Sequence, residues 1–304
     1  MDSSHGKRIV DALIGERAPT LYGFAPTRWA MQRLLQPVLH YREAVEVADQ
    51  IASLGGHAIM ALGVARLGLQ VRTLGLYRVP SHGRVILAPN HPTGLADGVA
   101  IWEALRRVRD DLRILANRDA IRLAAGLGDL IIPVEWVKSR RNPGDSRRVL
   151  ADVGNAFRAE EAIVLFPSGR IAHMTVRGLR ERPWLSTVVT LARRFEAPIL
   201  PVHIRARNSW LFYGLSQLSA ELRDVTLFHE LLNKGDRPFE LTFGDLVDPQ
   251  DLPPDPAEAV RLLQHHVEHD LPRASRLRPT LPRAGRLRPA LPRRRKLAAR
   301  APLT

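Results

Sequence analysis

Two residues whose side chains suit proton transfer, His91 and Asp97, lie in the segment NHPTGLADG, which spans residues 90–98. A histidine held by a carboxylate can act as a general base, because the carboxylate fixes the imidazole tautomer and leaves the other ring nitrogen free to take a proton from a hydroxyl or an amine. Pro92 and Gly94 bend the backbone between them, so the two side chains could face each other across a compact turn. On residue types alone, His91 could equally cap a helix or satisfy a buried carbonyl.

The elements around this segment predict where the turn lies. The apolar run Val-Ile-Leu-Ala at 85–88, between Gly83 and Pro89, predicts a buried strand, and the apolar pattern from Val99 onward predicts a helix. His91 and Asp97 are therefore expected on the connection between a strand and a helix, where α/β folds commonly place chemistry. An acyl donor that is already activated would need no nucleophile from the protein.

Strand and helix patterns alternate along the rest of the chain. We expect strands over 112–116, 130–134, 162–166, 198–204 and 239–243, and helices over 99–108, 118–127, 146–159, 185–195 and 256–269. Such alternation predicts an α/β fold with a mostly parallel sheet flanked by helices. Before it, residues 27–69 predict two or more helices, which could lie in a membrane interface or cover one face of the sheet.

A second candidate turn follows the strand predicted over 162–166, with the sequence Phe166-Pro167-Ser168-Gly169-Arg170. Pro167 and Gly169 would shape this turn and expose backbone N–H groups that could bind an oxyanion or a phosphate, with Arg170 as a fixed cation beside them. The plainer interpretation is an ordinary turn.

These motifs resemble those of a known family. NHPTGLADG resembles the first motif of the phospholipid/glycerol acyltransferase superfamily, and the five residues between His91 and Asp97 resemble its hemolysin-like and lyso-ornithine-lipid acyltransferase branch, whereas commoner members have four. The second turn resembles the third motif, Phe-Pro-Glu-Gly-Thr-Arg-Ser, with Ser168 in place of Glu, and that branch also lacks this Glu. PILPVHI at 198–204 resembles the fourth motif, and the resemblance covers roughly residues 74–246.

The resemblance implies a glycerolipid acyltransferase-like fold in which His91 is the base and Asp97 orients it. The second motif is poorly matched at 128–134, where Val134 stands in place of an Arg, so Arg118 is our candidate for the missing cation, although a surface helix residue is the plainer interpretation. Trp184 and His203 could line the pocket or belong to the core. The residues that we expect to bind substrate are Asn90, Gly94, Arg118, Phe166, Pro167, Ser168, Gly169, Arg170, Arg207 and Asn208.

The implied reaction moves a fatty acyl group from acyl-carrier protein or acyl-coenzyme A to a lysolipid of the lysophosphatidic acid or lyso-ornithine lipid type. It would need no cofactor beyond this co-substrate and no metal, and the enzyme would be peripheral on the cytoplasmic, inner face of the cell membrane. The alternative is a non-catalytic lipid- or nucleic-acid-binding protein, which would not need His91 and Asp97 in contact. A hydrolase has less support, because the chain has no GxSxG motif.

Composition divides the 304 residues into three predicted parts: an N-terminal helical region at 1–72, an acyltransferase domain at 73–270, and a tail at 271–304. The tail repeats LPRASRLRPT as LPRAGRLRPA, carries eleven basic and no acidic residues, and accounts for most of the net charge of +14. Its recurring prolines predict disorder. It could be an anchor for anionic lipid, which we favour, a nucleic-acid arm that lacks stacking aromatics, or a solubilising extension.

Other classes of protein find little support in the sequence. The chain has no cysteine, which excludes disulfides and thiolate metal sites, and its histidines lack the spacing of a zinc site. Residues 1–17 do not resemble a signal peptide. The longest uncharged apolar run, at 51–65, is shorter than the roughly 20 residues that a membrane-spanning helix needs, so no transmembrane helix is predicted.

Overall fold

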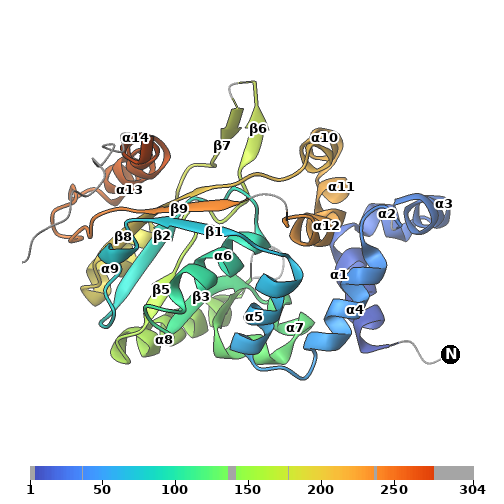
Figure 1. Ribbon diagram of the computed structural model, residues 1–304, viewed down its shortest axis with the longest axis horizontal. Coiled ribbons are helices and arrows are strands. Elements are labelled where there is room, and N and C mark those ends of the chain that lie inside the picture. Colours follow the sequence, from blue (N-terminus) through green and yellow to red (C-terminus); the bar gives the residue numbers. More distant parts are fainter. Residues whose placement is uncertain (1–3, 36, 136–141, 177, 236–237, 277–304) are drawn as a thin grey trace, which may run out of the picture.

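A seven-stranded sheet forms the centre of the computed structural model, which describes residues 4–35, 37–135, 142–176, 178–235 and 238–276 (Figure 1). The strand order is β1-β9-β8-β2-β5-β3-β4, and every neighbouring pair runs parallel except β8 and β9. The mostly parallel α/β sheet predicted from the sequence is thus confirmed. Its strands are β1 (Val71–Leu74), β2 (Val85–Pro89), β3 (Leu112–Asn117), β4 (Ile131–Val134), β5 (Ala162–Val164), β8 (Ile199–Arg205) and β9 (Phe239–Phe243).

Helices cover both faces of this sheet, which is why the central strands are apolar along their whole length. In β2, Val85 and Leu87 belong to one core and Ile86 and Ala88 to the other, so alternate side chains bury against opposite layers. The first core includes residues of α5 (Gly56–Arg66) and α6 (Leu95–Leu105). The second includes residues of α8 (Pro143–Arg158), α9 (Thr187–Phe195) and α13 (Pro256–His265).

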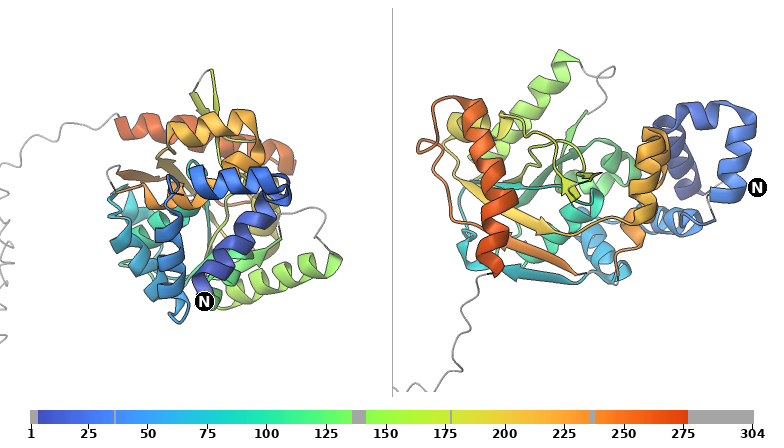
Figure 2. Two further views of the ribbon diagram at one scale, coloured as in Figure 1. Left: turned by 90° about the vertical axis from the view of Figure 1, so that its right-hand side faces the viewer. Right: turned by 90° about the horizontal axis from the view of Figure 1, so that it is seen from above.

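The helices expected near the N-terminus are present and continue to the first residues described. They are α1 (His5–Arg17), α2 (Pro19–Gly23), α3 (Ala25–Ala30), a π-helical segment (Met31–Leu35) and α4 (Tyr41–Ile51). Figures 1 and 2 show them beside α11 (Ala220–Val225) and α12 (Leu227–Leu232), with which they share a separate apolar cluster. No described helix is both long and apolar enough to cross a bilayer.

The single helix predicted over 118–127 is wrong. The structure has a short helix, α7 (Asp119–Leu123), then extended backbone at Ala124, and then a 3-10 helix at Ala125–Asp129. The break lets Gly126 approach the chain before α5 so closely that a Cβ atom there would lie 1.9 Å from the carbonyl oxygen of Leu54. The tertiary contact therefore overrides the local helical pattern.

Helical structure continues past residue 271, where we place the start of the tail. A π-helical segment (His266–Asp270) continues α13 directly into α14 (Leu271–Arg276). Leu271 is buried against the second core. The remainder of the tail, 277–304, lies outside the described residues.

Besides helices α10 (Trp210–Leu218), α11 and α12, three smaller features were not expected from the sequence. They are strand β1, a 3-10 helix at Leu76–Arg78, and a hairpin of β6 (His173–Thr175) and β7 (Gly178–Arg180). Figure 1 shows this hairpin projecting from the sheet beside α10. With only three residues in each strand, the hairpin is too short to give a clear alternating pattern.

We expect Gly126→Ala to lower the free energy of unfolding by about 1–3 kcal/mol, because the added methyl would force the 3-10 helix away from Leu54. Gly128→Ala is the matched control, since a Cβ atom at Gly128, in the same 3-10 helix, meets nothing within 4 Å. Urea denaturation of both variants measures the difference, and equal stabilities would contradict the close-approach argument.

Candidate active site

The candidate catalytic turn, residues 90–94, directly follows β2 at the C-terminal edge of the parallel strands. Helix α6 begins at Leu95, four residues earlier than predicted, so Asp97 lies in its first turn and not on the connection. Gly94 precedes the helix with a φ of 94°, in the region that favours glycine. The Asp97 carboxylate accepts hydrogen bonds from the backbone N–H groups of Thr93 at 2.9 Å and Gly94 at 3.0 Å.

The structure brings His91 and Asp97 into contact. Nδ1 of His91 lies 2.9 Å from Oδ2 of Asp97, and the Thr93 hydroxyl donates to Oδ1 of the same carboxylate at 2.5 Å. The Asp97 side chain is fully buried, whereas that of His91 is 18% exposed. Because Asp97 occupies Nδ1, the imidazole can present Nε2 to a substrate hydroxyl, which is the arrangement that a general base requires.

The backbone of His91 is tethered on both sides by the segment that follows β5. Its N–H donates to Oε1 of Glu181 at 2.9 Å, and its carbonyl accepts from the N–H of Ala172 at 2.8 Å. The ring also stacks on Phe166, with 4.1 Å between centroids. The catalytic turn and the second predicted turn are therefore neighbours in space.

The second turn, residues 166–170, is held by its own hydrogen bonds. The hydroxyl of Ser168 donates to the carbonyl of Arg170 at 2.8 Å, and the carbonyl of Pro167 accepts from Leu185. The backbone N–H of Gly169, one of the groups that we expected this turn to expose, donates to the carbonyl of Phe166 at 3.0 Å in this structure. The amide of Arg170 makes only a long contact of 3.5 Å to the Ser168 hydroxyl, so it is the more available donor in this turn.

Four arginines belong to the loops that hold the catalytic turn: Arg170, Arg180, Arg182 and Arg207. Each is within two residues of Ala172, Glu181 or Asn208, which bond directly to the turn. In the described part of the chain, no carboxylate forms an ion pair with any of the four, whereas exposed arginines elsewhere, such as Arg84 and Arg122, are paired. Arg170 and Arg207 were predicted, while Arg180 and Arg182 lie outside the family motifs and were missed.

Two asparagines that were predicted to bind substrate instead hold the backbone. The amide of Asn90 bonds the carbonyl of Ile204 at 2.9 Å and accepts from its N–H at 2.6 Å, which fastens the turn to β8. Asn208 is buried, and its Nδ2 donates to the carbonyl of Thr93 at 3.2 Å. Because both ends of each side-chain amide are engaged within the protein, we correct their role from binding to positioning.

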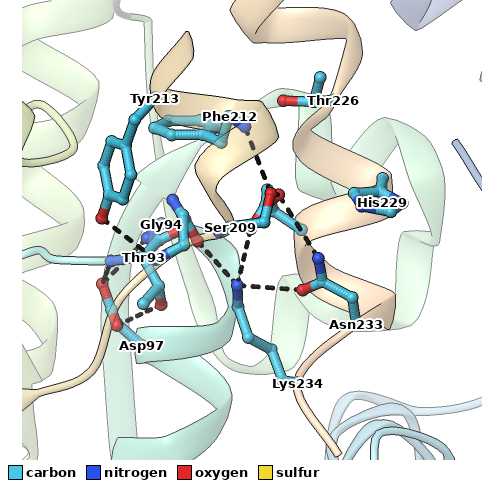
Figure 3. Close-up of polar contacts among 12 residues, drawn as sticks. Thr93, Gly94, Asp97, Ser209, Phe212, Tyr213, Thr226, His229, Asn233 and Lys234 are labelled. Atoms are coloured by element: carbon cyan, nitrogen blue, oxygen red, sulfur yellow. Dashed lines mark hydrogen bonds and ion pairs between the residues drawn. The ribbon is translucent and has the colours of Figure 1, made fainter. Parts of the chain in front are cut away.

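A buried ion pair contacts Asn208, and Figure 3 shows Lys234 of this pair with its surroundings. The side chains of Lys234 and Glu230 are 2% and 1% exposed, and Nζ of Lys234 lies 2.9 Å from Glu230 and 2.8 Å from Oδ1 of Asn208. Burial raises the pKa of Glu230, but Lys234 and hydrogen bonds from Ser209 lower it further, so the net pKa lies below the ordinary value. The i, i+4 spacing of these two residues was the sequence signal that could have revealed the pair.

Three further candidates were Arg118, Trp184 and His203. Arg118, the proposed substitute cation, lies 3.5 Å from Glu135 and 3.7 Å from Asp145, which makes it a partner of carboxylates in the protein. Trp184 packs in the second core, as the alternative interpretation held. His203 lies on β8 and is partly buried. Among the described residues there is no group of three side chains suited to hold a metal ion.

Glu181, which bonds the backbone of His91, has a raised pKa. Burial raises its pKa to about 7, against the hydrogen bond from the His91 N–H, which lowers it. Its Oε2 atom is buried without a hydrogen-bond partner in the described structure. Glu181 therefore holds the His91 backbone while close to half-protonated at neutral pH. It lies outside the family motifs, and no local pattern marked it.

Comparison with known proteins agrees with this geometry. A family model described as Acyltransferase matches residues 70–205, from the start of β1 to the end of β8, and so includes both turns. The chain belongs to the glycerolipid acyltransferase superfamily and is an O-acyltransferase. The superfamily predicted from the two motifs is thereby confirmed. The division of this acyltransferase into three parts and the roles of its site residues stay predictions.

Two relatives of this acyltransferase carry the same name, lyso-glycine lipid O-acyltransferase. The protein from Bacteroides thetaiotaomicron is 24% identical over 242 residues, which cover 77% of this chain and 86% of the relative. The protein from Phocaeicola vulgatus is 29% identical over 185 residues, or 59% and 64% of the two chains. The crystal structure of the 1-acyl-sn-glycerophosphate acyltransferase of Thermotoga maritima aligns with a TM-score of 0.45 and 16% identity over 88% of this chain and 96% of that one.

Replacing Lys234 tests the buried pair. We expect Lys234→Met to lower the free energy of unfolding by about 3–5 kcal/mol, because it leaves the Glu230 carboxylate buried without its cation. Adding Glu230→Gln should recover part of this loss. The matched control is Arg205→Met, which breaks the exposed Arg205–Glu240 pair and should cost about 1 kcal/mol or less. Urea denaturation compares the three, and similar losses in both single variants would contradict a special role for the buried pair.

The raised pKa of Glu181 predicts a pH-dependent stability. The unfolded chain releases this proton near 4.5, and the folded chain near 7, so the folded state holds the proton more tightly and the free energy of unfolding falls as pH rises through this window. We expect Glu181→Gln to be more stable than wild type by roughly 2 kcal/mol at pH 8, with a smaller difference at pH 5. Denaturation at both pH values measures it, with the exposed Glu46→Gln as the control for loss of charge.

Proposed function

We propose that this acyltransferase moves a fatty acyl group from a thioester carrier to the hydroxyl of a lysolipid in membrane lipid biosynthesis. The observation that carries the proposal is the contact between Nδ1 of His91 and the buried Asp97 carboxylate at the C-terminal edge of β2. The names of both curated relatives favour a lysolipid with an amino-acid headgroup as acceptor. Lysophosphatidic acid and lyso-ornithine lipid are the other acceptors to test.

The proposed mechanism needs one base and no covalent enzyme intermediate. Nε2 of His91 takes the proton of the acceptor hydroxyl while its oxygen attacks the thioester carbonyl carbon. The tetrahedral intermediate then collapses, the carbon–sulfur bond breaks, and the thiolate takes the proton from the imidazolium. The products are the acylated lipid and the free thiol carrier. Asp97 keeps the imidazole in the required tautomer and stabilises its charged form.

The negative charge that develops on the carbonyl oxygen needs a donor close to His91. Because the Gly169 amide is engaged, the Arg170 amide and guanidinium are the donors that we assign to this task. Phe166 and Pro167 form the wall of the second turn, and Phe166 packs against the face of the imidazole. No cofactor beyond the carrier thioester and no metal enters these steps.

The four unpaired arginines suit anionic groups on either substrate. They could hold the acceptor headgroup, or phosphates of acyl-coenzyme A or of the arm of acyl-carrier protein. A cationic rim would also speed the encounter with an acidic carrier protein by electrostatic steering. We further propose that the enzyme is peripheral, at the inner face of the cell membrane, where its lipid substrates lie.

The second candidate function, a non-catalytic lipid- or nucleic-acid-binding protein, has less support. Such a protein would not need the histidine and the carboxylate in contact, yet Asp97 is buried with every one of its hydrogen-bond donors supplied by the turn that carries His91. Burial of the Asp97 carboxylate costs desolvation free energy, and use of the dyad in catalysis would explain why the protein bears that cost.

The test is transfer of labelled acyl groups from both carriers to a panel of lyso-glycine lipid, lyso-ornithine lipid and lysophosphatidic acid. We expect product with at least one acceptor and a loss of about 100- to 10,000-fold in rate for His91→Ala. His82→Ala, at an exposed histidine before β2, is the matched control and should retain the rate. Transfer that persists in His91→Ala would refute the mechanism, and no transfer from either carrier would favour the binding protein.

A further inference from the structure

Helix α10, WLFYGLSQL, contains no charged residue, yet one of its sides faces solvent. Its exposed positions are Trp210, Leu211, Gly214, Gln217 and Leu218. At 100° per residue these positions form a single stripe, with Phe212 and Tyr213 buried on the other side. Trp210 is 70% exposed and Leu218 is 75% exposed, so the two large side chains lie largely in water.

This stripe is unusual for a helix in contact with water. The outward side of a surface helix normally carries charged and polar residues, as α8 does with Arg147, Arg148 and Arg158. An uncharged outward side with exposed Trp and Leu is instead what binding to a partner or to a membrane requires.

Other exposed apolar side chains lie around the same edge of the sheet. Val176 is fully exposed where the β6–β7 hairpin turns, and Figures 1 and 2 show this hairpin and α10 projecting on the same side of the molecule. Leu95 follows the catalytic turn directly, and the backbone N–H of Leu185 donates to the second turn. The side chains of both leucines are about half exposed. We call Leu95, Val176, Leu185, Trp210, Leu211 and Leu218 the α10 face.

Four arginines lie close to this surface in the sequence. Arg207 is three residues before Trp210, Arg180 ends the β6–β7 hairpin, and Arg170 and Arg182 flank the two turns. All four lack an ion-pair partner in the described structure, as shown above. Apolar side chains interleaved with free arginines match the interface of a bilayer that contains anionic lipid, where the apolar groups enter the acyl boundary and the guanidinium groups meet the headgroups.

We propose that the α10 face docks onto an anionic lipid bilayer and so presents His91 to the membrane in which the lysolipid is dissolved. The proposal rests on the proposed function for its purpose, although the docking itself does not depend on catalysis. Contact through this edge would spare the acceptor a passage through water, because Asn208, just before α10, and Glu181, just after the hairpin, both bond the catalytic turn. The bilayer surface is the occupant to which we commit.

The experiment compares the full-length wild type with Trp210→Ser/Leu218→Ser by co-sedimentation with phosphatidylcholine vesicles, with and without phosphatidylglycerol. We expect wild type to bind the anionic vesicles and the variant to bind them at least about tenfold more weakly. The matched control is Tyr77→Ser/Leu246→Ser, which removes exposed apolar side chains at the opposite edge of the sheet and should bind as wild type does. Circular dichroism confirms that each variant is folded.

A second control locates the membrane contact. Phe24→Ser/Trp29→Ser removes exposed aromatics from the N-terminal helices, and it too should keep binding. Loss of binding in this variant and not in the α10 variant would overturn the proposal. So would unchanged vesicle binding in the α10 variant, or a wild-type dimer that this variant converts to monomer, since a second copy would then cover the α10 face.

Activity separates the docking from the reaction. With lysolipid presented in vesicles, we expect the α10 variant to lose transfer, whereas with lysolipid in detergent micelles it should retain the wild-type rate. Equal loss in both assays by a folded variant would place these residues in the substrate site and overturn the docking. If wild type transfers nothing in micelles, the proposed function fails, while the vesicle-binding comparison still decides the docking.

Discussion

The buried carboxylate of Asp97 determines the local structure on which the candidate site depends. It accepts from His91, from the backbone of Thr93 and Gly94, and from the Thr93 hydroxyl, so a single side chain starts helix α6, closes the turn and orients the imidazole. A carboxylate removed from water is costly unless each of its oxygens is satisfied. Within this turn the donors are all local, which makes the geometry of the dyad a property of seven consecutive residues.

The surrounding protein fixes where this turn stands. Asn90 joins it to β8, Asn208 joins it to the loop before α10, and Ala172 and Glu181 hold the backbone of His91. Lys234 donates a hydrogen bond to Asn208 and forms with Glu230 an ion pair that is excluded from water. Such a pair contributes little net stability compared with apolar residues, but it tolerates only one arrangement of its partners. We infer that it serves the position of the turn more than the stability of the fold.

The sequence was sufficient for six of the seven strands of the sheet, for the two turns and for the contact between His91 and Asp97, because each rests on short-range patterns. The apolar run of β2, the bend at Pro92 and Gly94, and the family motifs all lie within a few residues of one another. The errors came from long-range contacts. Asn90 looked like a ligand because its partner, Ile204, is 114 residues away, and the helix over 118–127 breaks because Gly126 meets Leu54.

The same reasoning explains why Glu181, Arg180 and Arg182 were missed. Arg180 ends a hairpin of three-residue strands that has no clear periodicity, and Glu181 and Arg182 follow it. Only the folded chain brings Glu181 to the catalytic turn. Their neighbour Trp184 was recognised because a large aromatic residue is conspicuous in any sequence, yet it belongs to the core. Conspicuous residue types are thus a weaker guide to this site than its backbone connections.

The tethers of His91 have a consequence for how such an enzyme could change its substrate. Ala172 and Glu181 both reach His91 through its backbone, so neither tether uses the side chains of Arg170, Arg180 or Arg182. Arg180 and Arg182 could therefore be exchanged one at a time without moving the dyad. If they hold the headgroup as proposed, a lineage could acquire a new acceptor lipid through substitutions at these two positions, with His91 and Asp97 unchanged.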